Sequence, residues 1–216
     1  LLFMIIFLAH RMERSKNKKA GLADCRGKPG GASSGVSAVH AVKGFMISVL
    51  IECKDQEQAL AVTLASLVQG AVEGIVAEVI ILDRGSRDGT ALLADAAGCR
   101  FLEDPDLRDV VRSARGEWLL LIEPGARPLL GWVDHLGQHM SAGSMSARMR
   151  PSREYRLPFF QRLRRRVSAL EHGVLIPKRQ AMANAKSGDS LESLGRGLAM
   201  TRLKCEIVPA AVLALR

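Results

Sequence analysis

The sequence predicts an α/β protein with a mostly parallel sheet flanked by helices. Three observations predict this fold. Continuous apolar, β-branched runs alternate with helical segments four times between residues 46 and 140. The runs are unbroken, as in strands that are buried on both faces. The helical segments between them are bounded by capping residues or glycine, and such alternation is typical of a doubly wound, parallel sheet.

The first strand and the first helix follow directly on one another. Residues 46–53 (MISVLIEC) form the first apolar run. In residues 55–69 apolar side chains recur at helical spacing, with Asp55 as the expected N-cap and Gly70 as the expected glycine after the C-terminus. Residues 77–83 (AEVIILD) predict the second buried strand.

The later elements repeat this order with shorter segments. They are expected at residues 86–98 (helix), 99–103 (strand), 104–116 (helix, with Pro105 at its first position), 117–123 (strand) and 127–140 (helix). Ligands of such sheets bind beyond the carboxyl ends of the strands, near a topological switch point. We therefore expect a site at the loops 52–55, 83–89 and 123–127.

The positive charge is confined to two segments. The 216 residues carry 31 Lys and Arg against 22 Asp and Glu, a net charge of +9. Residues 1–45 hold eight basic and two acidic residues, and residues 148–166 hold eight arginines and one glutamate, so the rest of the chain is mildly acidic. Nucleic-acid binding is disfavoured, because no recognised nucleic-acid-binding motif accompanies the arginines.

Residues 1–45 are expected to form a disordered leader. Their apolar opening, residues 1–9, is too short to span a bilayer, and residues 13–44 lack a helical or strand period. Met46 directly precedes the first strand, so the folded unit is expected to begin there, as it would if the leader came from a misplaced start. The four widely spaced cysteines indicate neither a disulfide framework nor a zinc ribbon, which favours a reduced, cytosolic setting.

Three stretches of the chain occur in a characteristic order. They read ISVLIECKDQEQALAVTLASLV, then AEVIILDRGSRDGTALLADAAGCRFLE, then ARGEWLLLIEPGARPLLGW. In this order they resemble the family 2 glycosyltransferases, which have the nucleotide-sugar-binding GT-A fold, a DDGSxDGT-type turn and a later acidic DxD-type motif. The resemblance covers residues 46–140. It continues more weakly through GVLIPKRQAM (173–182), GDSLESLGRGLAM (188–200) and KCEIVPAAV (204–212).

The resemblance implies a division of the chain and an activity. Residues 46–140 would form the nucleotide-sugar-binding half, residues 141–168 an Arg-rich connecting segment and residues 169–216 the acceptor-side half of the same domain. The chain would transfer a sugar from a nucleotide-diphospho-sugar to a cell-envelope polysaccharide or lipid-linked acceptor. It would act in the cytoplasm, either free in solution or peripherally at the inner face of a membrane.

The resemblance also implies roles for individual residues. Asp83 would hydrogen-bond the nucleoside, and the same pocket would be lined by Cys53, Asp55, Gly85, Ser86 and Asp88. Asp189 would be the general base toward the acceptor hydroxyl, and Arg196 would contact phosphate. Glu123 would be a ligand of a divalent cation, Mg²⁺ or Mn²⁺, that bridges the diphosphate.

Three features depart from the family pattern. Arg84 stands where the turn usually has its second Asp, and the connection at residues 104–116 is short. The EPGA sequence at 123–126 offers one carboxylate where DxD has two, which argues against tight binding of a divalent cation. Arg87 and Arg127 are alternative groups for screening the phosphates.

Two rival functions remain open at this level. One is a non-catalytic descendant of the fold that serves as a binding or scaffold module. The other is a basic adaptor, because residues 148–166 interleave Tyr155, Phe159 and Phe160 with arginines and suit either a solvated loop, anionic lipid headgroups or a nucleic acid. His135 and His139 lie four residues apart, and we expect a solvated helix face there rather than a zinc site.

Overall fold

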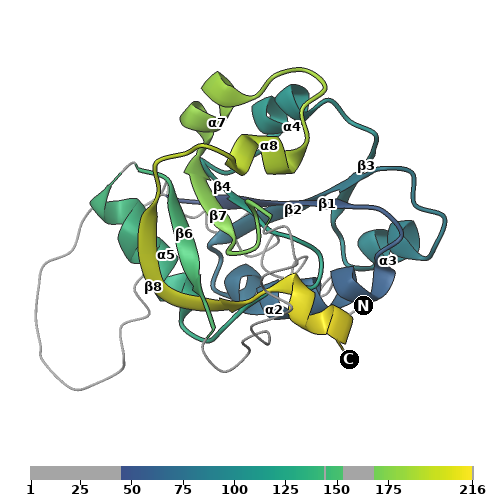
Figure 1. The fold of residues 1–216 in the computed structure, drawn as a ribbon, viewed down its shortest axis with the longest axis horizontal. Coiled ribbons are helices and arrows are strands. Elements are labelled where there is room, and N and C mark those ends of the chain that lie inside the picture. The colour runs from purple at the N-terminus through teal and green to yellow at the C-terminus, as the bar shows by residue number, and fades with distance from the viewer. Residues whose placement is uncertain (1–44, 144, 153–167, 216) are drawn as a thin grey trace, which may run out of the picture.

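The computed structural model describes residues 45–143, 145–152 and 168–215. They form an eight-stranded sheet with helices on both faces (Figure 1) and the strand order β3-β2-β1-β4-β7-β6-β8-β5. Four of the seven strand pairings are parallel. The predicted α/β fold with a mostly parallel sheet is therefore confirmed, whereas the predicted leader lies outside the described residues except for Phe45.

The first four strands form the parallel half of the sheet. They are β1 (Ile47–Cys53), β2 (Val76–Asp83), β3 (Arg100–Glu103) and β4 (Trp118–Leu121). Helices α2 (Glu57–Val72), α3 (Thr90–Ala96) and α4 (Leu107–Ser113) connect them. In the register Cys53 pairs with Asp83, and Asp83 pairs with Glu103, so the carboxyl ends of β1, β2 and β3 meet at one edge.

The last four strands form a mixed half of the sheet. They are β5 (Arg127–Pro128), β6 (Ala147–Pro151), β7 (Val174–Pro177) and β8 (Thr201–Val208). Strand β7 runs antiparallel to both β4 and β6, and β8 runs parallel to β6. Part of the predicted connecting segment thus belongs to the sheet as β6.

Short helices complete this second half. They are α5 (Trp132–Ala142), α7 (Lys178–Asn184), α8 (Leu191–Gly195) and the 3₁₀ helix η1 (Ala210–Leu215). The predicted helix at 127–140 begins later, because Arg127 and Pro128 pair with β8. Helix α8 is only five residues long, and Asp189 and Ser190 precede it, with Ser190 as its N-cap.

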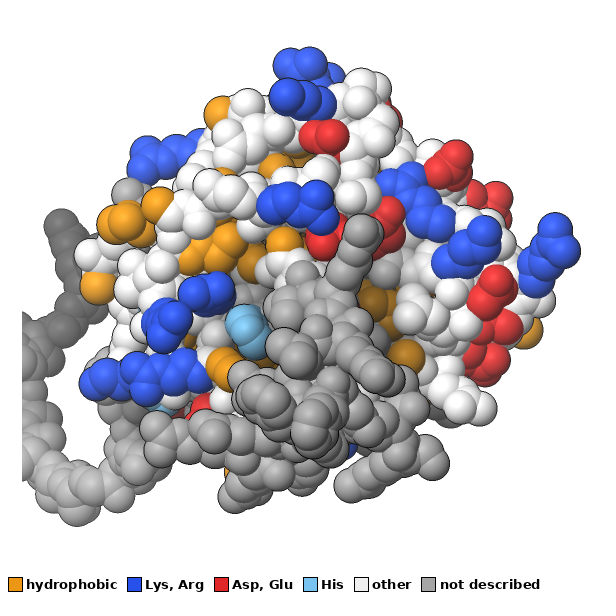
Figure 2. Space-filling view, in the orientation of Figure 1, with side chains coloured by type: hydrophobic (Ala, Val, Ile, Leu, Met, Phe, Trp, Pro, Cys, Tyr) orange, Lys and Arg blue, Asp and Glu red, His pale blue; other side chains and the backbone are white. Residues whose placement is uncertain are grey.

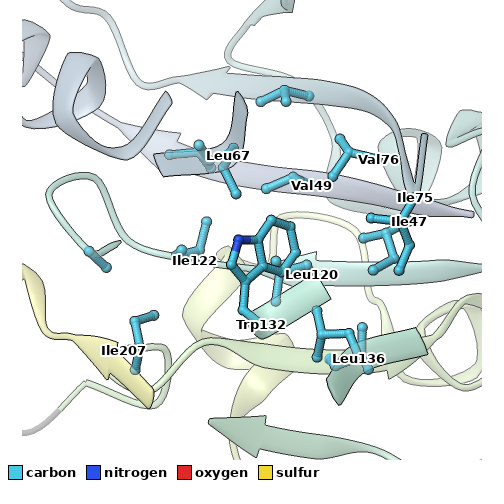
Figure 3. Close-up of a cluster of buried hydrophobic side chains, with 14 of the residues drawn as sticks. Ile47, Val49, Leu67, Ile75, Val76, Leu120, Ile122, Trp132, Leu136 and Ile207 are labelled. Carbon is cyan, nitrogen blue, oxygen red and sulfur yellow. The ribbon is translucent and has the colours of Figure 1, made fainter. Parts of the chain in front are cut away.

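One face of the sheet packs around Trp132. Figure 3 shows its indole among Leu67, Leu120 and Ile122, which come from α2 and from β4 and its continuation. A Cβ atom at Gly70 would lie 2.5 Å from the Trp132 ring, so Gly70 is needed for close packing inside α2. The expectation that Gly70 ends this helix is wrong.

Helix α2 ends at Val72, and the glycine that follows its C-cap residue is Gly74. Gly74 has a φ of +75°, and its N–H bonds to the carbonyl of Ala71 while the N–H of Ile75 bonds to the carbonyl of Gly70. This pair of bonds is a Schellman motif, which needs a residue in the left-handed conformation. Two further helices begin later than predicted. Helix α4 is capped by the Asp106 carboxylate and does not begin at Pro105, and α3 begins only at Thr90.

Candidate functional site

The candidate site lies where β1 and β2 end, as the sequence predicts. Asp83, the last residue of β2, is buried with 3% of its surface exposed. Its Oδ2 accepts hydrogen bonds from the N–H groups of Gly85 (3.0 Å) and Ser86 (2.9 Å), and its Oδ1 accepts one from the Ser86 hydroxyl. The carboxylate therefore shapes the turn after β2, while contact of Asp83 with a nucleoside stays a prediction.

The loops after β1 and β2 are braced against each other by four hydrogen bonds. The N–H of Asp55 donates to Ser86 Oγ (2.9 Å), and the N–H of Arg87 donates to Asp55 Oδ1 (2.6 Å). At the first residue of α2, the N–H of Glu57 donates to Asp88 Oδ2 (3.0 Å). The N–H of Gly89 donates to Glu57 Oε2 (3.2 Å) in return.

This brace corrects the expected role of Asp55. The N-cap position of α2 is Gln56, and its side chain makes no capping bond. Asp55 itself has a φ of +51°, and the first turn of α2 is capped from the neighbouring loop by Asp88. Hydrogen bonds from the Thr90 hydroxyl and the Glu57 N–H lower the pKa of Asp88, so this carboxylate stays ionised while it caps the helix.

Cys53 lines the inner side of the braced loops. It ends β1 and is buried. Burial, together with the nearby charges of Asp83, Asp88 and Glu52, raises the pKa of its thiol to about 12. Because the reactive form of cysteine is the thiolate, Cys53 is a neutral wall residue and not a nucleophile.

Arg84 joins three segments at this edge, a role that the sequence did not predict. Its Nε lies 2.7 Å from Glu52 Oε1, and its Nη1 lies 2.8 Å from Asp104 Oδ1. The Arg84 and Glu52 side chains are both about three-quarters buried, whereas the Asp104 side chain is 85% exposed. The Asp that the family has at this position is thus replaced by a cation held between two carboxylates.

Glu52 and Asp106 carry the network to the segment around α8. Glu52 Oε2 accepts a bond from the N–H of Leu191 (2.7 Å), the first residue of α8. Asp106 Oδ2 accepts bonds from the Ser187 hydroxyl and from the N–H of Gly188 (3.3 Å). The turn before α8 is therefore tied to the carboxyl edge of the parallel half.

Asp189 and Arg196 lie on either side of α8. Asp189 Oδ2 accepts a bond from the N–H of Lys186 (3.1 Å) within its own turn. Arg196 is mostly exposed and pairs with Glu192 at 2.9 Å across one helical turn. The structure therefore brings Asp189 to the predicted edge of the sheet, and its role as general base and the phosphate contact of Arg196 remain predictions.

The EPGA segment is a tight turn built around a buried threonine. The N–H of Gly125 donates to Thr63 Oγ1 (2.7 Å), and this hydroxyl donates to the carbonyl of Ala126 (3.0 Å). Glu123 is the sole carboxylate of the turn, and the described residues contain no group of three or more His, Cys, Asp or Glu arranged to hold a metal ion. Glu123 is thus the one carboxylate that this turn offers to a divalent cation, and its role as a metal ligand remains a prediction.

The two histidines of α5 bond to backbone carbonyls. His135 Nδ1 lies 2.7 Å from the carbonyl of Gly131, and His139 Nε2 lies 2.8 Å from that of Met145. The His139 ring also meets Trp118 edge to face at 6.0 Å. Both rings are half-buried, so the helix face that carries them is only partly exposed to solvent.

Most of the arginine-rich stretch falls outside the described residues, including Tyr155, Phe159 and Phe160. Its described part contributes Arg148 and Arg150 to β6. In the described ranges no helix has the length and hydropathy needed to cross a membrane. Contact of this stretch with anionic lipid and a place at the inner face of a membrane remain predictions.

Comparison with known proteins identifies the fold. No protein-family model matches the chain. Glucosyl-3-phosphoglycerate synthase from Mycobacterium tuberculosis, in a crystal structure with phosphoglyceric acid, superposes with a TM-score of 0.54 over 85% of this chain and 78% of that chain at 19% identity. The same enzyme with Mg²⁺ and uridine-diphosphate gives 0.54 over 84% and 76%, also at 19% identity. The chain has the GT-A fold of these glycosyltransferases.

A curated relative matches part of the sequence more closely. Glucosyl-3-phosphoglycerate synthase from Mycolicibacterium paratuberculosis is 35% identical over 94 residues, which is 43% of this chain. The match spans 28% of that relative's length.

Proposed function

We propose that this chain is a glycosyltransferase that uses a nucleotide-diphospho-sugar as donor. The observation that carries the proposal is the four-bond brace between the loops after β1 and β2, in a GT-A fold. A brace of this kind holds the loops in one arrangement before any ligand arrives, which lowers the entropic cost of binding. The partial sequence match to a glucosyl-transferring enzyme supports the same conclusion.

Asp83 is the proposed nucleoside contact. A carboxylate offers about four acceptor positions, and the turn after β2 engages three of those of Asp83. The remaining position, on Oδ1, suits a hydroxyl or N–H of the nucleoside. Cys53, Asp55, Gly85, Ser86 and Asp88 shape the same loops, and we propose that they bound the donor.

For the acceptor, we favour a small phosphorylated acid over the envelope polysaccharide or lipid-linked acceptor expected from the sequence. The name of the curated relative specifies glucosyl transfer to 3-phosphoglycerate, and one of the superposed structures contains phosphoglyceric acid. Asp189 is the proposed base toward the acceptor hydroxyl. Its turn is anchored at the donor edge through Glu52 and Asp106.

A second candidate function is nucleotide binding without transfer. The EPGA turn favours it, because a single carboxylate leaves the diphosphate without the cation site usual for this fold. In this case the chain would bind a nucleotide and form no glycoside.

The test combines binding with product analysis. We expect UDP-glucose to raise the melting temperature of the full chain, and Asp83→Asn to weaken that binding roughly tenfold or more, because a charged hydrogen bond contributes about 1.5–3 kcal/mol. Asp95→Asn, on the exposed face of α3, is the matched control and should bind normally. Incubation with UDP-glucose and 3-phosphoglycerate, with and without Mn²⁺, followed by mass spectrometry, separates the two functions. Binding without any glycoside would leave the second candidate, and equal binding by both variants would refute the role of Asp83.

A further inference from the structure

Strands β6 and β8 present a row of basic side chains on one face. Their apolar residues Ala147, Met149, Leu203 and Cys205 are buried in the core. Four of the residues that alternate with them are half-buried or exposed cations, Arg148, Arg150, Arg202 and Lys204, and the fifth is Glu206, the register partner of Arg150. Because side chains alternate along a strand, these cations project to the opposite face of the sheet. Lys and Arg side chains gather beside a histidine on the left of the molecule in Figure 2.

The two central arginines are direct neighbours. Arg148 and Arg202 are partners in the register of β6 and β8. Like charges placed opposite one another on adjacent strands repel and destabilise the pair. Among the described residues neither guanidinium forms an ion pair or a side-chain hydrogen bond. The fold thus places two cations together, and the charges around the adjoining His172 include one carboxylate, that of Glu171.

His172 adds a third nitrogen group to this cluster. It precedes β7, and its carbonyl accepts a bond from the N–H of Met149 (3.1 Å), which sets it beside β6. In the described structure its buried Nδ1 has no hydrogen-bond partner. Burial lowers the pKa of His172, and among the charges around it Glu171 raises that pKa whereas Arg148 and Arg202 lower it further.

The cluster lies at the same edge of the sheet as the donor loops. Strand β7 runs antiparallel to β4 with Val174 opposite Leu121, so His172 lies just beyond the carboxyl end of β4, as Glu123 does. Val174 is also the partner of Arg148, and it packs in one core cluster with Leu191 of α8. Arg148, His172 and the α8 turn that carries Asp189 therefore share one edge and one face.

We propose that Arg148, Arg202 and His172 form a phosphate-binding subsite. Guanidinium groups bind phosphate oxygens through paired, charge-assisted hydrogen bonds, and an imidazole nitrogen supplies a further donor. A phosphate between the arginines removes their mutual repulsion. The phosphate belongs either to the donor diphosphate, where it compensates for the poor cation site, or to the acceptor. The choice between these sources rests on the proposed function, whereas the site itself does not.

The site is tested by calorimetric titration of the full chain with inorganic phosphate and pyrophosphate at constant ionic strength. We expect the double variant Arg148→Gln/Arg202→Gln to bind at least one of these anions roughly tenfold to a hundredfold more weakly. The control Arg108→Gln/Arg179→Gln removes the same charge from exposed positions on α4 and α7 and should bind as the wild type does. Equal binding by all three proteins would overturn the site.

A second measurement needs no variant. The anion should raise the pKa of His172, because it stabilises the imidazolium. NMR of the imidazole protons measures this pKa. An unchanged His172 pKa at saturating phosphate would also overturn the site.

Competition identifies the source of the phosphate. UDP displaces pyrophosphate if the diphosphate occupies the site, and 3-phosphoglycerate displaces phosphate in the presence of UDP if the acceptor does. If neither UDP nor 3-phosphoglycerate competes, the site is not a transferase subsite, and the assignment of its phosphate to the donor or the acceptor fails. If UDP binds nowhere while the arginine-dependent phosphate site persists, the proposed function fails and the site stands.

Discussion

The two halves of the sheet differ in whether the charged side chains at their shared edge have partners. In the parallel half the acidic side chains after the strands are occupied: Asp83, Asp88 and Asp106 accept backbone N–H bonds, and Glu52 pairs with Arg84. In the mixed half Arg148 and Arg202 lie side by side, with no ion-pair partner among the described residues.

This difference indicates which half of the sheet has its charged side chains paired in the absence of a ligand. Ionised carboxylates that accept several N–H bonds rigidify their loops, so the parallel half forms its site before ligand arrives. Adjacent guanidinium groups lower stability unless an anion lies between them. We therefore regard the first half as a preformed frame and the second as the half that depends on a charged ligand.

The largest effect is expected from breaking the parallel half at Gly116. A Cβ atom at this position would lie 2.4 Å from the backbone nitrogen of Ser48, and backbone in a paired strand has little room to move. Gly116→Ala should cost more than about 3 kcal/mol in the free energy of unfolding, as overpacking in a core does at its upper end. Urea denaturation measures it. Gly143→Ala, which meets nothing within 4 Å, is the control and should unfold at nearly the wild-type urea concentration.

A smaller effect is expected from cutting the link between the halves at Glu52. Glu52→Gln weakens the bond to Arg84 and the bond from the Leu191 N–H, at a cost of about 1–2 kcal/mol for a partly buried charged pair. Hydrogen exchange should show faster opening of α8 than of β1. Asp104→Asn removes only the exposed partner of Arg84 and should cost less than about 0.5 kcal/mol. Equal losses in both variants would contradict the link.

The smallest effect is a pH dependence from His172. Its pKa is lowered in the folded chain by burial and by Arg148 and Arg202, against the opposing charge of Glu171. The unfolded chain therefore binds protons more readily near and below about pH 6.5, and the stability of the folded chain falls as the pH drops through that range. His172→Gln should reduce this fall, measured by urea denaturation at pH 7.5 and 5.5 without phosphate. Identical slopes in both proteins would contradict the prediction.

Sequence reasoning found the parallel half because its strands are unbroken apolar runs, such as VLI in β1 and VIIL in β2. It missed β6, where ARMRP offers only two core residues between arginines and a proline. It also wrongly expected Asp55 to cap the first turn of α2 and Gly70 to follow its last turn. The real cap of α2 comes from Asp88 in another loop, and the reason for Gly70 is the Trp132 ring, which is distant in sequence.

The sequence by itself determined the order of strands and helices in the parallel half and the edge of the sheet at which the loops after β1 and β2 meet. Each depends on residues that are near one another along the chain. Only the tertiary structure decided which carboxylates Arg84 pairs with, how the turn of Asp189 is anchored and which arginines lie side by side. Arg84 bonds to Glu52, which lies 32 residues away in the sequence, and Leu191 bonds to the same glutamate from a distance of 139 residues. Arg148 meets Arg202 only because β6 and β8 pair. Such partners depend on strand register, which no local pattern in the sequence specifies.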